Sequence, residues 1–330
     1  MKKKLLYALL VLLGTTQAFA DAKSDAASKP VTLTFGIIFA PDTLAGKGGY
    51  KFVDIIKAKS GGNINVIYKP GGALGDERAH IEQVTTGTID LMATGDGMIA
   101  ANAPAFAVMT MPFVFRNADH AMKVRAGDIG KRMNDAMIKN SGVRIMGWQN
   151  IGARQLTSNK PVNNLADLKG LKMRLPDVKW WIKAWEKTGV SVATVAFNEL
   201  YLALQTGTVD AEENPADFVK GQKFYEVQKY LILTNHVQNI NGWYVNEQKF
   251  QSLSANQKKW LTESIQEAAS WVTEQAKTVD AEAIKFLAAD GKMQLVRPDL
   301  QGLQALLKNL PTEVGGDSAQ KLYDEIQSVK

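Results

Sequence analysis

The sequence uses the same helix-to-strand connection twice, around Gly87 and around Gly207. In both places a helical pattern ends in Thr-Gly-Thr, a β-branched residue and Asp, and a short strand pattern follows. Glycine is favoured just past a helix because it accepts left-handed backbone angles. Each strand then delivers polar residues to the carboxyl edge of its sheet, where open α/β sheets bind ligands. Two such edges predict two α/β lobes with a ligand between them.

The start of the chain predicts an export signal over residues 1–20 rather than a part of the fold. Three lysines at 2–4 precede an apolar run over 5–13, and Ala-Phe-Ala at 18–20 is a small-x-small cleavage site. The apolar run is too short to span a bilayer as a helix. We therefore expect a linker over 21–30 and localisation in the periplasm.

The bulk composition excludes several classes of protein. The chain carries 39 basic and 33 acidic side chains, and loss of the three signal lysines leaves a net charge of +3. A charge this mild and dispersed does not indicate nucleic-acid binding. The absence of cysteine excludes disulfides and thiol catalysis. The length and the 45% hydrophobic content allow two ordinary domains.

Strand patterns alternate with helical patterns over most of the chain, which indicates mostly parallel sheets covered by helices. Asp76 is expected to cap the helix that ends at Thr86. We predict strands at 31–35, 64–68, 144–148, 153–157, 171–174 and 192–195, and helices at about 45–59, at 118–138 with a break near Gly127, and at 178–188.

The pattern changes after residue 253. Ser254 to Gln257 forms a capping box, and helical periodicity continues without proline or glycine to about Ala288. Such a helix is roughly 50 Å long, longer than one lobe is wide, so we expect it to lie across both lobes. A short strand at 293–296, a helix capped by Asp299 and a final helix near 318–327 complete the prediction.

Enzyme signatures are absent from the sequence, which has no phosphate-binding loop, no Gly-x-Ser-x-Gly elbow and no His-Glu-x-x-His zinc motif. The histidines, His80, His120 and His236, fall in different segments, and we expect surface or structural roles for them. Glu212 and Glu213 are adjacent on a predicted strand, so at most one can point into a cleft. We therefore expect binding rather than catalysis, with no catalytic residue, metal or cofactor.

Three polar residues form a more promising set: Arg154, Arg174 and Asn214. Arg174 and Asn214 each stand at a strand end just before a proline, and Arg154 follows Gly152 near the start of another strand. An arginine grips a carboxylate with two parallel hydrogen bonds and stays charged at any relevant pH. Spacing alone leaves open whether these are binding residues or solvated loop residues.

The sequence resembles the solute-binding proteins of TRAP transporters, tripartite carriers that take up organic acids using an ion gradient. The resemblance covers essentially the whole mature chain and rests above all on Leu-Lys-Gly-Leu-Lys-x-Arg at 168–174 and on the block over 197–215. It implies that Arg174 forms the main salt bridge to the ligand carboxylate and that Arg154 and Asn214 complete this site. Ala211-Glu212 departs from the Gly-Gln of many members, which puts the local hydrogen bonding of that strand end in doubt.

The resemblance also implies an architecture. This is an α/β, two-lobed periplasmic binding protein fold with mixed, mostly parallel sheets, two crossing strands and a long helix spanning both lobes. The chain is expected to switch lobes near Ile151 and Ile240 and to return along the long helix near Val279. The resulting lobes are discontinuous, with lobe I formed by 31–151 and 240–279 and lobe II by 152–239 and 280–330.

The partners implied are a small organic acid and the small and large membrane permease subunits of the carrier. We expect a monomer that binds no nucleic acid. The remaining pocket is expected to come from strand ends and loops of lobe I and from aromatic side chains of lobe II. Its predicted lining residues are Ile37, Ile38, Glu77, Arg78, Gly95, Asp96, Phe197 and Trp180.

These residues leave the substrate open. Glu77 and Asp96 can accept hydrogen bonds from the hydroxyls of a sugar acid, whereas Arg78 can take the second carboxylate of a dicarboxylate. The apolar Ile38 leaves keto acids and aromatic acids possible. Two other functions also remain open at this point: a periplasmic hydrolase or lyase on the same fold, and a receptor that presents its ligand to a signalling partner.

Overall fold

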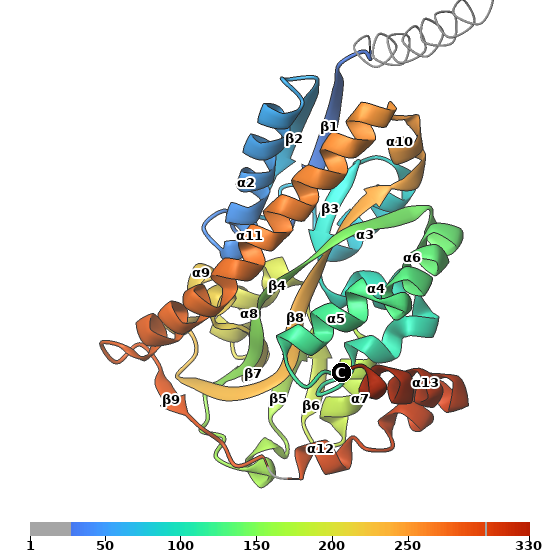
Figure 1. Ribbon diagram of the computed structural model, residues 1–330. Coiled ribbons are helices and arrows are strands. Elements are labelled where there is room, and N and C mark those ends of the chain that lie inside the picture. The colour runs from blue at the N-terminus through green and yellow to red at the C-terminus, as the bar shows by residue number, and fades with distance from the viewer. Residues whose placement is uncertain (1–27, 301) are drawn as a thin grey trace, which may run out of the picture.

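The computed structural model describes residues 28–300 and 302–330, so the expected export signal and most of the linker lie outside the described residues. The described chain forms a nine-stranded sheet in the order β2-β1-β3-β8-β4-β7-β5-β6, with β9 paired to β8 (Figure 1). Five of the eight strand pairings are parallel. The mixed, mostly parallel α/β architecture is confirmed, and the two expected sheets are joined into one.

The first part of the chain builds the β2-β1-β3 side of this sheet. Asp76 caps α3 as predicted, with its carboxylate accepting the backbone N–H of Ala79 at 2.8 Å. The expected break at Gly127 separates α5 from α6. The elements are β1 (Val31–Gly36), α2 (Leu44–Lys59), β2 (Ile64–Lys69), α3 (Glu77–Thr86), β3 (Leu91–Thr94), α4 (Asp96–Asn102), the 3-10 helix η1 (Pro104–Thr110), α5 (Ala118–Ala126) and α6 (Asp128–Ser141).

The middle of the chain builds the β7-β5-β6 side. β5 lies between β7 and β6 and pairs with both in parallel, so its carboxyl end lies inside the sheet rather than at a free edge. The elements are η2 (Leu165–Leu168), β5 (Lys172–Leu175), α7 (Lys179–Glu186), β6 (Ser191–Thr194), η3 (Phe197–Glu199), α8 (Leu200–Gln205), β7 (Ala211–Pro215), α9 (Ala216–Gly221) and η4 (Phe224–Glu226).

The repeated connection has the same structure on both sides. Gly87 and Gly207 have left-handed φ angles of 79° and 69°. The aspartate that ends each motif accepts a hydrogen bond from the backbone of the neighbouring strand. Asp90 accepts the N–H of Thr34 in β1 at 2.8 Å, and Asp210 accepts the N–H of Lys172 in β5 at 3.4 Å. Each aspartate therefore fixes where its own strand starts relative to the strand beside it, and the polar strand ends arrive at a common edge.

Two long strands connect the two sides. β4 (Val143–Ser158) and β8 (Tyr230–Asn246) run antiparallel along their length, and Figure 1 shows them crossing the molecule together. The sequence interpretation that 144–148 and 153–157 are separate strands is wrong. Gly152, with φ 104°, lies in an irregularity of the β4–β8 pairing that lets one strand continue past it.

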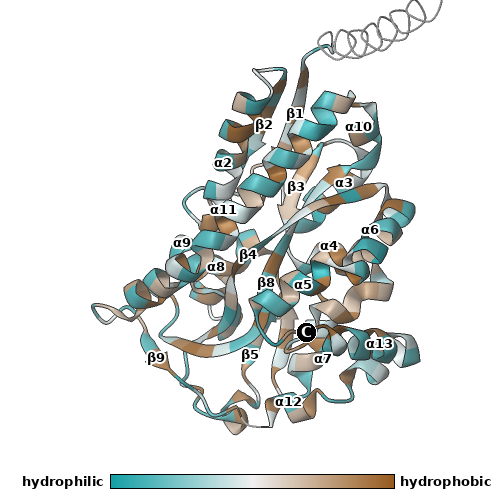
Figure 2. Cartoon of the chain, viewed as in Figure 1, coloured by the Kyte–Doolittle hydropathy of each residue, from teal (hydrophilic) through white to brown (hydrophobic). Residues whose placement is uncertain are grey.

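The predicted long helix is present as α11 (Ala255–Ala288), 34 residues with a capping box at Ser254. It runs diagonally along the molecule, packed on α2, α9 and β4 (Figure 1), and hydrophilic residues recur along it in Figure 2. Thr273 ties it to the crossing strand, because its hydroxyl accepts the backbone N–H of Asn150 at 3.0 Å. α10 (Glu247–Ser252) joins it to β8.

The C-terminal part differs from the prediction in two respects. After β9 (Gln294–Val296), helix α12 (Leu303–Leu306) begins at Gly302 with φ 93°, so it is not capped by Asp299. Asp299 instead forms an isolated bridge with Asn164. The last helix, α13 (Leu310–Ser328), starts earlier than expected, is interrupted at Gly316 and packs on η1 and α7.

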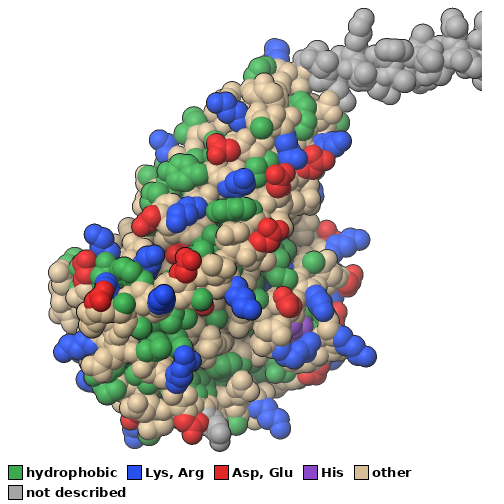
Figure 3. Space-filling model, turned by 60° about the vertical axis from the view of Figure 1, so that its left-hand side comes forward, with side chains coloured by type: hydrophobic (Ala, Val, Ile, Leu, Met, Phe, Trp, Pro, Cys, Tyr) green, Lys and Arg blue, Asp and Glu red, His purple; other side chains and the backbone are tan. Residues whose placement is uncertain are grey.

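The surface is charged, with side chains of both signs. Basic and acidic side chains are interspersed over the face shown in Figure 3. Among residues 28–300 and 302–330, the structure holds no helix with the length and apolar character needed to cross a bilayer.

Candidate functional site

The strand ends of both sides face a common cavity of about 50 Å³, here called the inner chamber. It continues outward into a cavity of about 390 Å³, the outer chamber, and both are lined by Arg174, Phe197 and Glu77. The inner chamber is lined by Ile38, Phe39, Glu77, Gly95, Asp96, Gly97, Arg154, Arg174, Pro176, Val178, Trp181, Phe197, Asn214, Asn239 and Asn241. The binding residues expected from sequence, Arg154, Arg174 and Asn214, therefore meet in one place.

Arg174 lies at the carboxyl end of β5 with 3% of its surface exposed. Its Nε donates to the carbonyl oxygen of Val195 at 2.8 Å, which fixes the plane of the guanidinium group. Within the part of the chain that the structure describes, no carboxylate forms an ion pair with it. Burial lowers the pKa of Arg174 to about 10, and the group remains charged at neutral pH. The site thus contains a buried, oriented positive charge with which no carboxylate pairs directly, although Glu212, Glu213 and Glu77 raise its pKa from a distance.

Arg154 has a different environment. Its guanidinium group donates to Glu213, with NH2 2.8 Å from Oε1 and Nε bonded to Oε2, and it lies 4.6 Å from the ring centre of Trp181. His236 Nε2 also contacts Glu213 Oε2 at 2.8 Å. Burial alone would raise the pKa of Glu213, but Arg154 and His236 outweigh it and the pKa is lowered. Arg154 therefore borders the chamber with its charge already balanced.

Asn214 stands at the end of β7 beside Arg174. Its Nδ2 donates to Glu212 Oε2 at 2.6 Å, and Glu212 Oε1 lies 2.9 Å from the hydroxyl oxygen of Thr157. Both Glu212 and Glu213 are fully buried, and neither lines the inner chamber. The two acids instead support the side chains that do, since one holds Asn214 and the other holds Arg154.

The opposite wall of the chamber is polar. Asp96 forms a buried ion pair with Arg125 at 3.1 Å, and burial raises the pKa of Asp96 to about 6. Glu77 accepts a hydrogen bond from the hydroxyl of Thr94. Asn241 is 1% exposed, yet neither its Nδ2 nor its Oδ1 has a hydrogen-bond partner. A buried amide without a partner in the protein is free to bond a polar group of a ligand.

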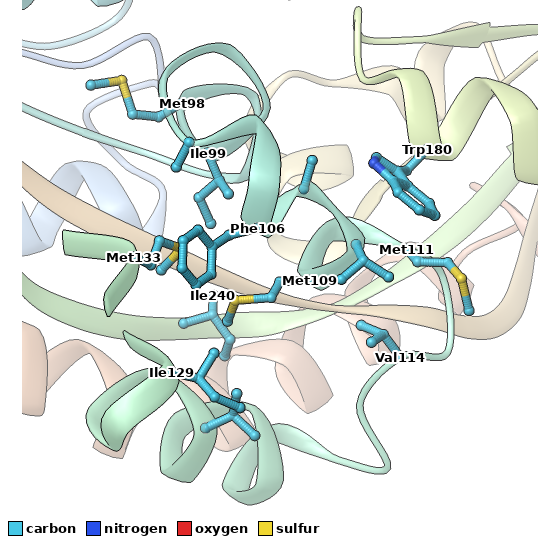
Figure 4. Packing of buried hydrophobic residues seen from close by; sticks show 14 of the residues in the cluster. Met98, Ile99, Phe106, Met109, Met111, Val114, Ile129, Met133, Trp180 and Ile240 are labelled. Carbon is cyan, nitrogen blue, oxygen red and sulfur yellow. The ribbon is translucent and has the colours of Figure 1, made fainter. Parts of the chain in front are cut away.

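Three predicted lining residues lie outside the wall of the inner chamber. Trp180 packs among the apolar side chains of a core cluster with Met111 and Val114, as Figure 4 shows, while its neighbour Trp181 lines the chamber. Arg78 is exposed and borders only the outer chamber. Ile37 is buried in another core cluster, while Ile38 reaches the chamber.

Among the aromatic and polar lining residues, sequence reasoning missed Phe39, Trp181 and two residues of the crossing strand β8, Asn239 and Asn241. A signal for the asparagines was available, because they alternate with apolar residues at a spacing of two and so share one face of a strand. The histidines are structural, since each is at most 3% exposed and none lines the chamber.

Within residues 28–300 and 302–330, no group of three or more histidine or acidic side chains is placed to hold a metal ion. The chamber offers what a small anion with hydroxyl groups needs: one unpaired guanidinium group, an amide beside it, and amides and carboxylates on the far wall. Its aromatic residues, Phe39, Trp181 and Phe197, add apolar surface to the wall.

Known proteins share both sequence and structure with this chain. The family model described as bacterial extracellular solute-binding protein, family 7 (DctP), matches residues 35–314. The sialic acid-binding periplasmic protein SiaP of Vibrio cholerae is 32% identical over 296 residues, which cover 88% of this chain and 92% of that protein.

Solved structures agree with this match. A TRAP periplasmic solute-binding protein from Polaromonas sp. JS666, bound to D-erythronate, superposes with a TM-score of 0.86 at 30% identity and covers 91% of this chain and 99% of that chain. A TRAP solute-binding protein from Roseobacter denitrificans with bound L-galactonate also has a TM-score of 0.86, at 26% identity, and covers 92% and 100%. All of these are solute-binding proteins rather than enzymes.

Proposed function

Because this chain belongs to family 7 of the bacterial extracellular solute-binding proteins, we propose that its inner and outer chambers bind a polyhydroxylated monocarboxylic acid. In this proposal Arg174 grips the carboxylate, Asn214 and Arg154 flank it, and the hydroxyl groups face Glu77 and Asp96. As a solute-binding component of a TRAP transporter, the protein delivers its ligand to membrane permease subunits.

The observation that carries the proposal is the unpaired charge of Arg174. A buried guanidinium group without a counter-ion is costly unless a ligand supplies the negative charge. The neighbouring charges are already used, because Arg154 pairs with Glu213 and Arg125 with Asp96. One unpaired arginine in the inner chamber therefore favours one carboxylate in the ligand.

The polar far wall favours a sugar acid over an aromatic or a simple aliphatic acid. Asn241 and Asn239 from β8, together with Asp96, present amide and carboxylate groups to the part of the ligand beyond its carboxylate. Each unpartnered amide atom gains a hydrogen bond when a hydroxyl group arrives. The relatives bound to D-erythronate and L-galactonate support this class of ligand. Arg78, on the outer chamber alone, is placed for a second carboxylate only in a longer ligand.

We also propose a location and an oligomeric state for the protein. The protein is exported by the signal over residues 1–20 and acts in the periplasm, where the family works. It acts as a monomer, since the large exposed apolar side chains are few among the described residues and lie on separate elements, namely Tyr50, Ile67, Leu202, Leu295 and Leu306. The molar mass from light scattering of the purified protein tests whether it is a monomer.

A thermal-shift screen against an organic-acid library tests the function. Sugar acids of four to six carbons should raise the melting temperature, since a ligand at 100 times its Kd stabilises by about 2.7 kcal/mol. Dicarboxylates and aromatic acids serve as the contrast at equal concentration. Stabilisation by succinate or benzoate alone would overturn the sugar-acid proposal, and chemical turnover of a stabilising acid would favour an enzyme.

A further inference from the structure

Glu212 is a buried carboxyl group next to the chamber but not in its wall. It lies on β7 two residues before Asn214 and is 0% exposed. Its Oε2 accepts the Asn214 amide at 2.6 Å, and its Oε1 lies 2.9 Å from the Thr157 hydroxyl oxygen. Glu212 therefore makes no direct contact with a ligand and acts on it through the Asn214 amide and through its own charge.

The hydrogen bonds around Thr157 place a proton on Glu212. The Thr157 hydroxyl oxygen lies between Glu212 Oε1 and Gln228 Oε1, at 2.9 and 3.0 Å. Gln228 donates its Nε2 to the carbonyl oxygens of Asp210 and Val227, so its Oε1 faces Thr157 and can only accept. Thr157 has one proton and faces two oxygens, Gln228 Oε1 and Glu212 Oε1. If Glu212 were ionised, one of these two contacts would join two acceptors. Both are hydrogen bonds only if Glu212 carries a proton and donates to Thr157, which then donates to Gln228.

The charges that face Glu212 agree with a neutral acid. Burial and the neighbouring Glu213 together raise the pKa of the Glu212 carboxyl to about 7, although the hydrogen bond from Asn214 lowers it. Arg154 lowers it, but Arg154 is paired with Glu213, which His236 also contacts. The remaining cation is Arg174, which attracts an ionised Glu212 until a ligand carboxylate neutralises the guanidinium group.

Resting on the proposed carboxylate site, we propose that Glu212 is a positioning residue that works as an uncharged acid. In this form it holds the Asn214 amide and leaves Arg174 free for the ligand. A ligand carboxylate at Arg174 lies near Glu212, and like charges disfavour ionisation. Above a pH of about 7, binding therefore transfers one proton from the buffer to the Glu212 carboxylate, and the affinity falls as the pH rises.

An infrared titration of the ligand-free protein tests the protonation state without any ligand. The C=O stretch of a protonated carboxyl should be present in wild type at pH 6 and disappear as the pH rises through about 7, and this component should be missing from Glu212→Gln. Identical titrations of the two proteins would overturn the proposal. If the variant does not fold, labelling wild type with carboxyl-¹³C glutamate assigns the band, and its absence at pH 6 overturns the proposal equally.

Calorimetry with D-erythronate as the probe tests the linkage. At pH 8, in two buffers that differ in ionisation heat, wild type should take up close to one proton per ligand and Glu212→Gln none. Between pH 7.5 and 8.5 the wild-type affinity should fall up to tenfold, and that of Glu212→Gln should stay level. Asp280→Asn is the matched control, because burial also raises the pKa of Asp280 to about 6 but Asp280 lines neither chamber, so its removal should leave this slope in place.

Equal proton uptake by wild type and Glu212→Gln would overturn the linkage. Failure of every protein to bind D-erythronate would instead count against the proposed function for this acid. The infrared titration would still decide the state of Glu212, so the two failures are distinguishable.

Discussion

Arg154 and Glu213 are joined by a two-pronged ion pair between the neighbouring strands β4 and β7, with 6% and 0% of their surfaces exposed. His236 also contacts this pair, with its Nε2 2.8 Å from Glu213 Oε2. Arg154 is a balanced, rigid part of the wall, whereas Arg174 carries the free charge.

Glu213→Gln should destabilise the protein by about 3–5 kcal/mol, because it leaves the Arg154 charge buried without its partner. Urea unfolding measures the change. The matched control is Glu325→Gln, which breaks the exposed pair with Arg132 and should cost no more than about 1 kcal/mol. Since the pKa of Glu213 is lowered in the folded state, the pair stabilises above the unfolded-state value, and this stability is lost as the pH falls through the folded-state pKa. Equal effects of the two variants would contradict the prediction.

Arg174→Lys should cripple ligand binding although the charge is kept. A lysine cannot form the two-pronged contact with a carboxylate, and it cannot keep the hydrogen bond to Val195 in the same geometry. Truncating one partner of such a buried pair costs about 2–5 kcal/mol, or roughly 30- to several-thousand-fold in affinity. Calorimetry with a sugar acid measures it, and Arg78→Lys at the outer chamber is the control. An Arg174→Lys affinity within about threefold of wild type would remove Arg174 from the primary site.

Asn241→Leu should separate stability from binding. The buried amide of Asn241 has no partner in the ligand-free protein, so its replacement by a similar apolar side chain should leave stability unchanged or raise it by about 1 kcal/mol. Affinity for a sugar acid should fall at least tenfold. Asn246→Leu is the control, because the Asn246 amide bonds to Val84 and Lys249 and its loss should destabilise. A destabilised Asn241→Leu would show that this amide is satisfied in the free protein.

Ala269→Pro should destabilise the fold by about 3 kcal/mol or more, because it interrupts the hydrogen bonds of α11 in its middle. Ala269 is 2% exposed, and its carbonyl accepts the Thr273 hydroxyl, which in turn accepts the Asn150 N–H of β4. Thermal unfolding measures the loss. Ala255→Pro, at the first position of the same helix, should be tolerated. If Ala269→Pro were as stable as Ala255→Pro, an unbroken α11 would not be required for the stability of the fold.

Closure around a ligand should reduce the radius of gyration in small-angle scattering. A ligand that bridges Arg174 on one side and Asp96 on the other favours the compact state, because it binds that state more tightly. We expect the fall with a sugar acid and no change with an acid that does not stabilise the protein. A constant radius at saturating ligand would exclude a closing cleft.

The sequence alone predicts the position of a site residue where that position follows from the end of a strand. Arg174 and Asn214 could be placed because each precedes a proline at a strand end. The helix face of α7 could not be decided in the same way. Val178 and Trp181 line the chamber, while Trp180 faces the cluster that contains α13. The rotation of α7 depends on contacts with a helix 130 residues later, and no local pattern contains that information.

The crossing strands show a second limit. Gly152 was interpreted as a boundary, but a positive φ within an irregular pairing lets β4 continue past it. The role of Glu212 was also beyond the sequence. A buried acid between Asn214 and Thr157 can be called neutral only once the hydrogen bonds of Thr157 have been counted.

The β4–β8 ribbon has a consequence for how the molecule unfolds. Both strands contribute hydrogen bonds to both ends of the sheet, from the pair Val143 and Asn246 to the pair Ser158 and Tyr230. If one end of the sheet unfolds, the backbone hydrogen-bonding groups of β4 and β8 become exposed there, and the other end of the sheet is built on the same two strands. Although the chain is built from two lobes, we expect a single cooperative heat-absorption peak, and the amides at the centre of the ribbon should exchange with solvent only when the whole protein opens.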